Sequence, residues 1–357
     1  MRLAQVCPRY YPYIGGVETH VKEISERLVK KAFDVEILTA NSSGKLPRQE
    51  TLMGVTIRRF REWAPNEAYY SSRELRKYLL QRSCYYDVVH AHAYHALPAL
   101  YASQAKNGNK LVFTPHYHGV GHTLFRNLLL KFYKFWGKKI FEKADHVVCV
   151  SEYEKKLLSK HFKVDDEKVV VIPNGINLEE FRGLKRQSND CGVILCVSKL
   201  DKFKGVQYLI KALPRLDNDS ILVIVGKGSY KKSLINLART LGVEERVNFF
   251  QDLPRNELLK KYAEADVFAL LSRYEAYGIC IAEALAARTP CVVANTSALK
   301  EWVDDKNCFG IDYPVNVSRL AKLLNKVIGK EVEDVRLPDW NDTVERLIEL
   351  YQSLCGQ

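Results

Sequence analysis

The chain has 357 residues, of which 47% are hydrophobic and 27% charged, with 19 glycines and 12 prolines, and this composition excludes a disordered, collagen-like or fibrous chain. The length suits two domains of ~100 to 200 residues each. The net charge of +12 is uneven, because residues 1–182 hold 29 Lys and Arg against 19 Asp and Glu, whereas residues 183–357 hold 25 against 23. The basic first half suits nucleic acid, an anionic membrane or a phosphorylated substrate, and charge alone does not choose among them.

The first half alternates short runs rich in Val and Ile with longer amphipathic stretches, the pattern of βαβ units around a parallel sheet. Val17, Val21, Ile24 and Leu28 recur at helical spacing and predict an amphipathic helix after the first strand. The predicted strands of this half are residues 2–8, 34–40, 55–60, 87–92, 110–116, 146–151 and 169–173.

The second half repeats this alternation after a polar segment, residues 182–191, which we interpret as a linker. Its predicted strands are residues 192–198, 221–226, 247–250, 266–271 and 291–295, and its helices include residues 205–213, a segment ending near 241, and one starting at 281. A last helix is predicted at 340–354. The sequence therefore predicts an α/β protein with two Rossmann-like doubly wound domains, residues 1–182 and 183–335. In such sheets ligands bind beyond the carboxyl ends of the strands, so we expect the site in an interdomain cleft.

The segment from Ser272 to Asn295 carries the most chemical information. A predicted strand ends there in a polar loop with Glu275 and Gly278, and the following helix carries Glu283. Free backbone amides at a helix start can hold phosphate or sugar oxygens, and a carboxylate one turn later can accept hydrogen bonds from the vicinal hydroxyls of a ribose. As an isolated pair, such glutamates more often merely favour a helix amino terminus.

Six segments, in order along nearly the whole chain, resemble those of family 4 retaining glycosyltransferases of the GT-B fold, the glycosyl transferases group 1. Each segment alone is a weak signal, but the six in the family's order are a strong one. They are YYPYIGGVETHVKEISERL (10–28), VIPNGIN (171–177), VSKLDKFKGVQYLIKAL (197–213), VGKGSY (225–230), YAEADVFALLSRYEAYG (262–278) and the E-x7-E segment EAYGICIAEALA (275–286).

The resemblance implies roles for the second domain. Glu283 is expected to bind the ribose of a nucleotide-diphosphate sugar, a UDP- or GDP-sugar. Glu275, with the backbone amides of Tyr277, Gly278 and Ile279, is expected to bind the donor sugar or its phosphates. Lys204 would neutralise the diphosphate as it leaves. Lys199 stands where the family usually has arginine, so a point charge replaces a bidentate grip.

The resemblance also implies roles for residues of the first domain. Gly15 and Gly16 lie in the first strand-to-helix loop, which the family places close to the leaving phosphate and the transferred sugar; a tight turn is the structural alternative. His116 resembles the family's catalytic-cleft histidine, which would bind the donor sugar and help position the acceptor, and His118 is an alternative counterpart. Histidines are dense here, which would suit a metal site, but their spacing carries no HExxH or Cys/His signature. Alternation along a strand would place His90 and His92 on one face.

The sequence departs from the family pattern around the sugar pocket, with Ala276 and Arg288 in place of glycines. The choice of donor sugar is therefore left open. Asp217 to Asp219 reads DND, like the DxD motif of metal-dependent transferases, but it lies in a polar segment that we interpret as a turn. We accordingly expect catalysis without a metal and no cofactor. The chain has nine cysteines, an odd number, and none of them forms a CxxC pair. This pattern predicts reduced thiols rather than disulfides or a zinc site.

Residues 122–143 combine six basic side chains, one acidic side chain and six aromatic rings, a pattern typical of a helix in a membrane interface. The alternative is a core helix whose lysines extend to solvent. No recognised motif supports nucleic-acid binding. No apolar run reaches the ~18 residues of a membrane span, and the amino terminus has no secretion-signal pattern, so we expect a cytoplasmic protein, peripheral on the cytoplasmic face of a membrane if that helix binds lipid.

The function that the resemblance implies is retaining hexosyl transfer from a nucleotide-diphosphate sugar to a hydroxyl acceptor, with a lipid-linked or membrane-bound glycan as the expected acceptor. The first domain would bind the acceptor and the second the donor, and the segment 336–357 would cross back onto the first domain, as in similar proteins. Three alternatives remain open: a catalytically silent nucleotide-sugar-binding protein at the membrane surface, a GT-B-like epimerase or phosphorylase, and, with least support, a dinucleotide oxidoreductase, because VGKGSY is no GxGxxG fingerprint.

Overall fold

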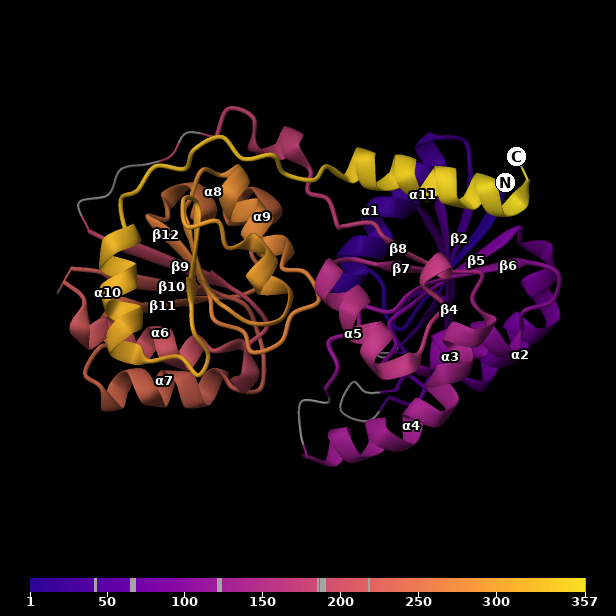
Figure 1. Cartoon of the computed structure of the whole chain (residues 1–357), viewed down its shortest axis with the longest axis horizontal. Helices are drawn as coiled ribbons and strands as arrows, with labels where there is room; N and C mark the ends of the chain where they lie inside the picture. Colours follow the sequence, from indigo (N-terminus) through magenta and orange to yellow (C-terminus); the bar gives the residue numbers. More distant parts are fainter. Residues whose placement is uncertain are drawn as a thin grey trace. The chain divides into compact units, whose positions relative to one another are not determined.

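The structure, a computed structural model, describes residues 1–41, 44–64, 69–120, 124–184, 186, 191–217 and 219–356, and within residues 124–143 it describes side chains from 133 onward. The chain divides into two compact units (Figure 1). The first unit comprises Met1–Gly175 and Trp340–Gln357, and the second comprises Ile176–Asp339. Each unit is an α/β layer structure built on one sheet. The predicted fold class, two Rossmann-like domains, is therefore confirmed.

The first unit contains an eight-stranded sheet in the order β3-β4-β2-β1-β5-β6-β7-β8. Its strands pair in parallel, except that β3 runs antiparallel to β4 at the edge. The strands are β1 (Arg2–Cys7), β2 (Asp34–Ala40), β3 (Gln49–Leu52), β4 (Val55–Phe60), β5 (Val88–His92), β6 (Lys110–Thr114), β7 (His146–Cys149) and β8 (Val169–Val171).

Helices cover both faces of this sheet. One face packs in a hydrophobic core against α2 (Arg73–Arg82), α3 (Leu97–Gln104), α4 (Leu124–Lys143) and α5 (Glu152–Phe162). The other face packs against α1 (Gly16–Lys30), in which Val21, Ile24 and Leu28 of the predicted apolar stripe are buried and Val17 is partly buried. Helix α11 (Trp340–Cys355) packs against α1 and buries Leu347 and Tyr351 (Figure 1). The last helix of the chain thus completes the first unit.

The second unit contains a six-stranded parallel sheet in the order β11-β10-β9-β12-β13-β14. Its strands are β9 (Val193–Val197), β10 (Ile221–Val225), β11 (Val247–Phe250), β12 (Val267–Leu270), β13 (Cys291–Ala294) and β14 (Cys308–Ile311). Its helices are α6 (Val206–Ala212), α7 (Lys231–Thr240), α8 (Arg255–Glu264), α9 (Ile279–Ala286) and α10 (Val317–Val327).

Alternate residues of the central strands of this sheet enter two different cores. Ile194 and Cys196 of β9 belong to the core that faces α6, α7 and α10, whereas Val193 and Leu195 belong to the core that faces α8 and α9. A strand whose two faces are both buried reads as a continuous apolar run. For this reason the Val- and Ile-rich runs located these strands correctly in the sequence.

Several predicted limits need correction. Most strands end one or two residues inside their predicted limits, and the edge strands β3 and β14 were not predicted. Helix α9 begins at Ile279, whereas a helix from Ile281 was predicted. The division between the units falls between Gly175 and Ile176, before the predicted linker at 182–191, of which residues 185 and 187–190 lie outside the described residues.

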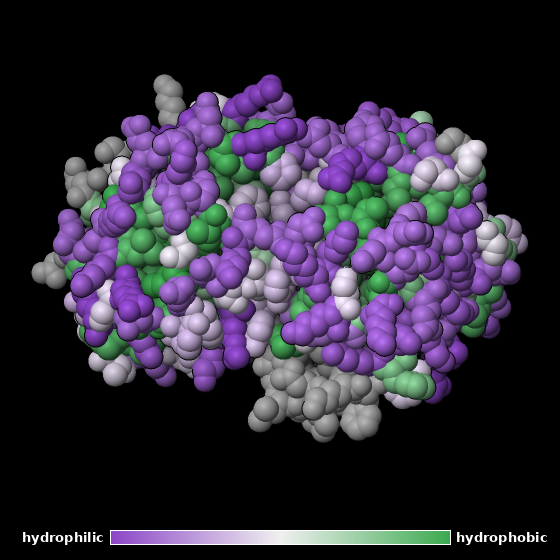
Figure 2. All heavy atoms as spheres, viewed as in Figure 1, coloured by the Kyte–Doolittle hydropathy of each residue, from purple (hydrophilic) through white to green (hydrophobic). Residues whose placement is uncertain are grey.

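The face of the molecule seen in Figure 2 is largely polar. Figure 2 shows hydrophilic residues over most of the face in view, with hydrophobic residues in separate patches between them. In the part of the chain that the structure describes, no helix combines the length and apolar character needed to span a bilayer. All nine cysteines are free in the structure.

Candidate active site

The strand order of each sheet reverses direction at one place, between β1 and β5 in the first unit and between β9 and β12 in the second. Ligands of open α/β sheets bind at such switch points, in the loops that follow the carboxyl ends of the strands. In the second unit these loops are residues 198–205 after β9 and 271–278 after β12, and they contain most of the predicted donor-binding residues.

Backbone contacts fix these two loops to each other. Gly205 adopts a φ of 77° at the start of α6, and a Cβ atom added there would lie 2.1 Å from the carbonyl oxygen of Leu271. The amide of Arg273 donates a hydrogen bond of 2.8 Å to the carbonyl oxygen of Phe203. A side chain at position 205 would therefore drive the loops apart.

Lys204 and Glu275 form an ion pair across these loops. Lys204 Nζ lies 2.5 Å from Glu275 Oε1, and the two side chains are 16% and 17% exposed. Burial disfavours the charged ammonium, but the charge of Glu275 and its hydrogen bond outweigh that effect, so the pKa of Lys204 is raised above its ordinary value. Lys204 therefore stays cationic at neutral pH.

The loop that carries Glu275 is held by further hydrogen bonds. The amide of Glu275 donates to Ser297 Oγ at 3.0 Å, and the indole nitrogen of Trp302 donates to the carbonyl oxygen of Tyr277 at 3.0 Å. Gly278 has a φ of 104°, which a side chain would strain, and α9 starts at the next residue. The first amides of a helix have no intrahelical acceptor, so the start of α9 offers donors to an anionic or hydroxylated ligand.

Glu283 lies one turn into α9, where residues of α8 hold it from two sides. Tyr262 OH donates to Glu283 Oε2 at 2.8 Å, and Arg255 Nη1 donates to Glu283 Oε1 at 2.6 Å. Arg255 also pairs with Glu180 at 2.7 Å. Burial opposes the charge of Arg255, but the two carboxylates outweigh it and raise the pKa of its guanidinium. The sequence identified Glu283 but not Arg255, Tyr262 or Glu180, because only tertiary packing of α8 against α9 and against the segment Leu178–Phe181 brings them together.

Other predicted elements of this unit lie beside the same loops. Lys199 follows β9 with its ammonium 3.6 Å from Asp201 and its side chain 55% exposed. Cβ atoms added to Gly226 and Gly228 would lie 1.9 and 2.3 Å from the carbonyl oxygens of Ser198 and Leu200. The GxG turn therefore packs directly on the loop after β9, which explains its glycines.

In the first unit, Gly15 and Gly16 begin α1 after β1. Gly15 has an extended backbone with φ of −177°, and a Cβ atom there would lie 2.5 Å from Glu18 Oε2, whereas one on Gly16 would meet nothing within 4 Å. Neither glycine is required by a left-handed backbone. The tight-turn alternative thus receives no support from φ at these positions.

His116 follows β6 and adopts a φ of 48°. Burial lowers its pKa well below the usual value, and His20 and His90 act in the same direction. The ring of His118 stacks on that of His95 at 4.6 Å, so the two candidates belong to different groups of rings. The rings of His90 and His92 lie 4.2 Å apart, which confirms that the strand presents both on one face.

The segment 217–219 behaves as the predicted turn where the structure describes it. The amide of Ser220 donates to the carbonyl oxygen of Asp217 at 3.0 Å, the bond that closes a β-turn. That carbonyl oxygen also accepts from Arg246 at 2.7 Å, and Asn218 lies outside the described residues.

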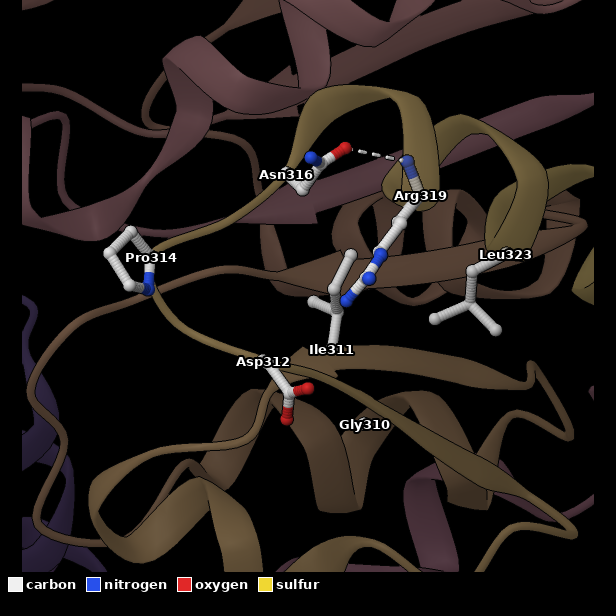
Figure 3. Close-up of a pocket in the computed structure, with 7 residues that line it drawn as sticks. All are labelled: Gly310, Ile311, Asp312, Pro314, Asn316, Arg319 and Leu323. Atoms are coloured by element: carbon white, nitrogen blue, oxygen red, sulfur yellow. Dashed lines mark hydrogen bonds between the residues drawn. The ribbon is translucent and has the colours of Figure 1, made fainter.

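A separate hollow of about 250 Å³ lies where β14 ends and α10 begins (Figure 3). Asn316 Oδ1 caps α10 there by accepting a hydrogen bond of 3.0 Å from the amide of Arg319. None of the predicted site residues lines this hollow, and we assign it no part in the site. Its lining residues are Gly310, Ile311, Asp312, Pro314, Asn316, Arg319 and Leu323.

Comparison with known proteins identifies the class. The model of Glycosyltransferase Family 4 matches residues 14–180, and that of Glycosyl transferases group 1 matches residues 179–339. An uncharacterized glycosyltransferase of Methanocaldococcus jannaschii is 29% identical over 92% of this chain and 89% of its own length. The GPI3 subunit of phosphatidylinositol N-acetylglucosaminyltransferase from Saccharomyces cerevisiae is 23% identical over 99% of this chain and 83% of its own length.

Among solved structures, Anabaena HepE in complex with UDP-glucose superposes with a TM-score of 0.79 at 18% identity, covering 99% of this chain and 100% of that chain. The fold is thus that of the GT-B glycosyltransferases. Taken together, the two family models span residues 14–339, and the chain belongs to the family 4, group 1 glycosyltransferases.

Proposed function

We propose that this protein transfers a hexosyl unit from a nucleotide-diphosphate sugar to a hydroxyl acceptor with retention of configuration. The observation that carries the proposal is the arrangement at the β9/β12 switch point. There the Lys204–Glu275 ion pair stands beside the start of α9, and Tyr262 and Arg255 fix Glu283 one turn further on. A buried cation, free helix amides and an oriented carboxylate are the groups that a diphosphate, a sugar and a ribose require.

Each residue would have a distinct part in the reaction. Glu283 would accept hydrogen bonds from the ribose hydroxyls, and Lys204 would stabilise negative charge on the diphosphate as the glycosidic bond breaks. Glu275 and the amides of Tyr277, Gly278 and Ile279 would orient the donor sugar. The permanent charge of Lys204 would serve where other transferases use a metal ion, so we propose metal-independent transfer.

In the first unit, His116 would hydrogen-bond the donor sugar and help position the acceptor, while the backbone at Gly15 and Gly16 would approach the leaving phosphate. The lowered pKa of His116 keeps its ring neutral at pH 7, so one ring nitrogen can accept a hydrogen bond. The first unit is accordingly proposed to bind the acceptor.

A donor assay tests the proposal directly. Thermal-shift screening against UDP-, GDP- and ADP-sugars should identify a donor that raises the melting temperature of the wild type. With that donor, Lys204→Ala should lower kcat by roughly 10²- to 10³-fold, whereas Lys260→Ala, at an exposed lysine of α8, should leave it unchanged. Equal activity of the two variants would refute the role of Lys204.

The thermal-shift and donor assays, together with an absorbance spectrum of the purified protein, separate the alternative functions. A silent sugar-nucleotide-binding protein would show the thermal shift but no hydrolysis or transfer that depends on Glu275, as judged with Glu275→Ala. A phosphorylase would carry pyridoxal absorbance in the purified wild type. An epimerase would change the configuration of the donor sugar without an acceptor.

For the acceptor, we propose a lipid-linked or membrane-bound glycan or a phospholipid. From residue 133 onward, α4 buries Tyr133, Ile140 and Phe141, but its Phe135 and Trp136 are 73% and 51% exposed. Lysines accompany these exposed rings: Lys138 is 55% exposed, and Lys139 Nζ lies 6.0 Å from the Phe135 ring centre. Such an aromatic and basic face suits an anionic membrane surface. The yeast relative bears the name of a transferase that acts on phosphatidylinositol, in keeping with such an acceptor.

Sedimentation with vesicles tests this part. Wild type should sediment with vesicles that contain anionic lipid, and the double variant Phe135→Ser/Trp136→Ser should remain in the supernatant. Leu80→Ser, which removes another exposed apolar side chain of the first unit, serves as the matched control. If the double variant sediments as wild type does, the membrane proposal is wrong.

A further inference from the structure

Three imidazole rings from three different segments converge inside the first unit. His20 comes from α1, His92 ends β5 and His116 follows β6. Their ring centres lie 5.3, 5.0 and 5.9 Å apart, and one ring nitrogen from each lies within 4.8 Å of the other two. His20 and His92 are fully buried, whereas His116 is partly exposed. The sequence search for a metal signature missed this set because adjacent strands and a crossover helix, not short spacing, bring the rings together.

Amide oxygens determine which nitrogen of two of these rings carries the proton. His20 Nδ1 lies 2.7 Å from Asn174 Oδ1, and His92 Nε2 lies 2.8 Å from Gln5 Oε1. An amide oxygen only accepts hydrogen bonds, so both of these nitrogens must donate. In a neutral ring the opposite nitrogens, His20 Nε2 and His92 Nδ1, then present lone pairs.

Each of the three converging rings also has one nitrogen that no other group satisfies. Within the described residues, His20 Nε2, His92 Nδ1 and His116 Nε2 are buried and have no hydrogen-bond partner. Buried polar atoms without partners are uncommon and unfavourable in folded proteins. Three such nitrogens on three neighbouring rings, two of them fixed as acceptors, are groups that a cation would satisfy.

We propose that His20, His92 and His116 form a binding site for one first-row transition-metal ion of the Zn²⁺ class. Neutral imidazole is a preferred ligand of zinc, copper, nickel and iron. The hydrogen bonds to Asn174 and Gln5 are the second-layer contacts that orient ligating histidines. Three protein ligands leave a fourth position for water or another ligand on the partly exposed His116 side.

A bound ion sets the spacing of its ligand nitrogens. Nitrogens bound tetrahedrally at about 2.0–2.1 Å lie about 3.4 Å apart, and one nitrogen of each of the three rings already lies within 4.8 Å of the other two. His20 and His92 are held by the helix and strand that carry them, whereas His116 lies in a loop beyond β6. Any adjustment to the geometry of the ion is therefore expected at His116.

Metal binding would have a consequence for the reaction, and this consequence rests on the proposed function. The ion would occupy Nε2 of His116, the side chain proposed to contact the donor sugar. Zn²⁺ should therefore inhibit transfer. Binding itself requires no substrate and can be measured independently.

The test is Zn²⁺ binding to chelator-treated full-length protein, measured by equilibrium dialysis with elemental analysis. His20→Asn retains a donor near the position of Nδ1 and removes Nε2, while His92→Gln retains one near Nε2 and removes Nδ1. Wild type should bind one ion per chain, and each variant should bind at least 100-fold more weakly. The control His146→Gln alters a histidine of β7 outside the set and should stay within threefold of wild type.

Several results would overturn the site: no stoichiometric binding by wild type, or wild-type affinity in either variant whose melting curve shows that it folds. X-ray absorption at the zinc edge of the loaded wild type gives a measurement independent of variant folding, and fewer than three imidazole ligands would also overturn it. Binding without inhibition of transfer would leave the metal site standing and would instead refute the role proposed for His116.

Discussion

The hydrogen bond from Tyr262 to Glu283 is expected to strengthen donor binding, because it orients the Glu283 carboxylate. Tyr262→Phe removes the 2.8 Å hydrogen bond to Glu283 Oε2 and leaves the buried ring in place. Arg255 alone would then hold the carboxylate. Because a hydrogen bond to a charged group contributes about 1.5–3 kcal/mol, the KM for the donor should rise by roughly tenfold or more. The bond acts equally in the ground and transition states, so kcat should change little.

Steady-state kinetics with varied donor concentration checks this expectation. Tyr85→Phe, at a 56% exposed tyrosine of the first unit, is the control and should leave both constants unchanged. A loss confined to kcat would contradict a role in donor binding.

The buried carboxyl group of Glu154 should make the free energy of unfolding depend on pH. Its buried carboxylate accepts hydrogen bonds from the amides of Tyr117 at 2.5 Å and Val150 at 2.8 Å. Burial raises the pKa of Glu154 to about 8, although the two hydrogen bonds oppose this. Because the folded-state pKa exceeds the unfolded value of about 4.3, the stabilisation is complete below that value and is lost as the pH rises through about 8.

Urea denaturation of wild type and Glu154→Gln at pH 5 and pH 8 measures this effect. The free energy of unfolding of wild type should fall relative to that of the variant by on the order of 1.4 kcal/mol per pH unit over this interval. The variant removes the titrating group and supplies the baseline. Parallel pH profiles for the two proteins would show that Glu154 keeps an ordinary pKa.

The residues that the sequence could identify are those of contiguous motifs. Glu275, Glu283 and Lys204 were found because each stands in a segment whose order and spacing resemble a family pattern. Arg255 lies 28 residues before Glu283, in a segment that carries no motif. Tyr262 begins one of the six segments, but nothing there indicates that its hydroxyl contacts a residue 21 positions further on. Their role depends on helix packing, which local sequence does not encode.

At the scale of elements, Gly205 decides whether the loops after β9 and β12 can meet. Gly205→Ala would place a Cβ atom 2.1 Å from Leu271 O and would force a side chain into a φ of 77°. Gly242→Ala is the matched control, because its φ of 64° is similar but nothing lies within 4 Å. Both variants pay the backbone strain of about 1–2 kcal/mol, and only the first adds the overlap.

We therefore expect Gly205→Ala to lower the free energy of unfolding of the second unit by at least about 2 kcal/mol more than Gly242→Ala. Chemical denaturation of both variants measures the difference. Equal losses would mean that the loops can separate without cost.

Elements were predictable where burial is complete and less so at the edges. The limits of β2 and β4 match the predicted strands. Six successive buried residues end β2 at Ala40, and buried residues alternate along β4 from Val55. Strand β3 was missed: it is four residues long, largely polar, and pairs only at the sheet edge. The early start of α9 follows from Gly278, whose left-handed backbone ends the loop, so that the helix begins at Ile279, two residues before the predicted start.

At the scale of the whole molecule, the division between the units lies where residues begin to pack in the core of the second unit, and not where the sequence becomes polar. The polar segment 182–191 predicted a boundary there, but Ile176 and Phe181 are already buried in a core of the second unit. A polar stretch marks only where the chain runs over the surface. The chain therefore enters the second unit before its composition changes.

Helix α11 returns the chain to the first unit and allows a test of whether the two units unfold independently. Leu347 of α11 is fully buried in the first unit, although it follows the whole of the second unit in sequence. Leu347→Ala should cost about 3 kcal/mol, and because each unit has its own core, the loss should be local. Hydrogen exchange should show reduced protection in β1 and β5 and unchanged protection in β9 and β12. Ser353→Ala, at an exposed position of the same helix, should alter neither set, and a loss of protection shared by both sheets would mean that the units unfold as one.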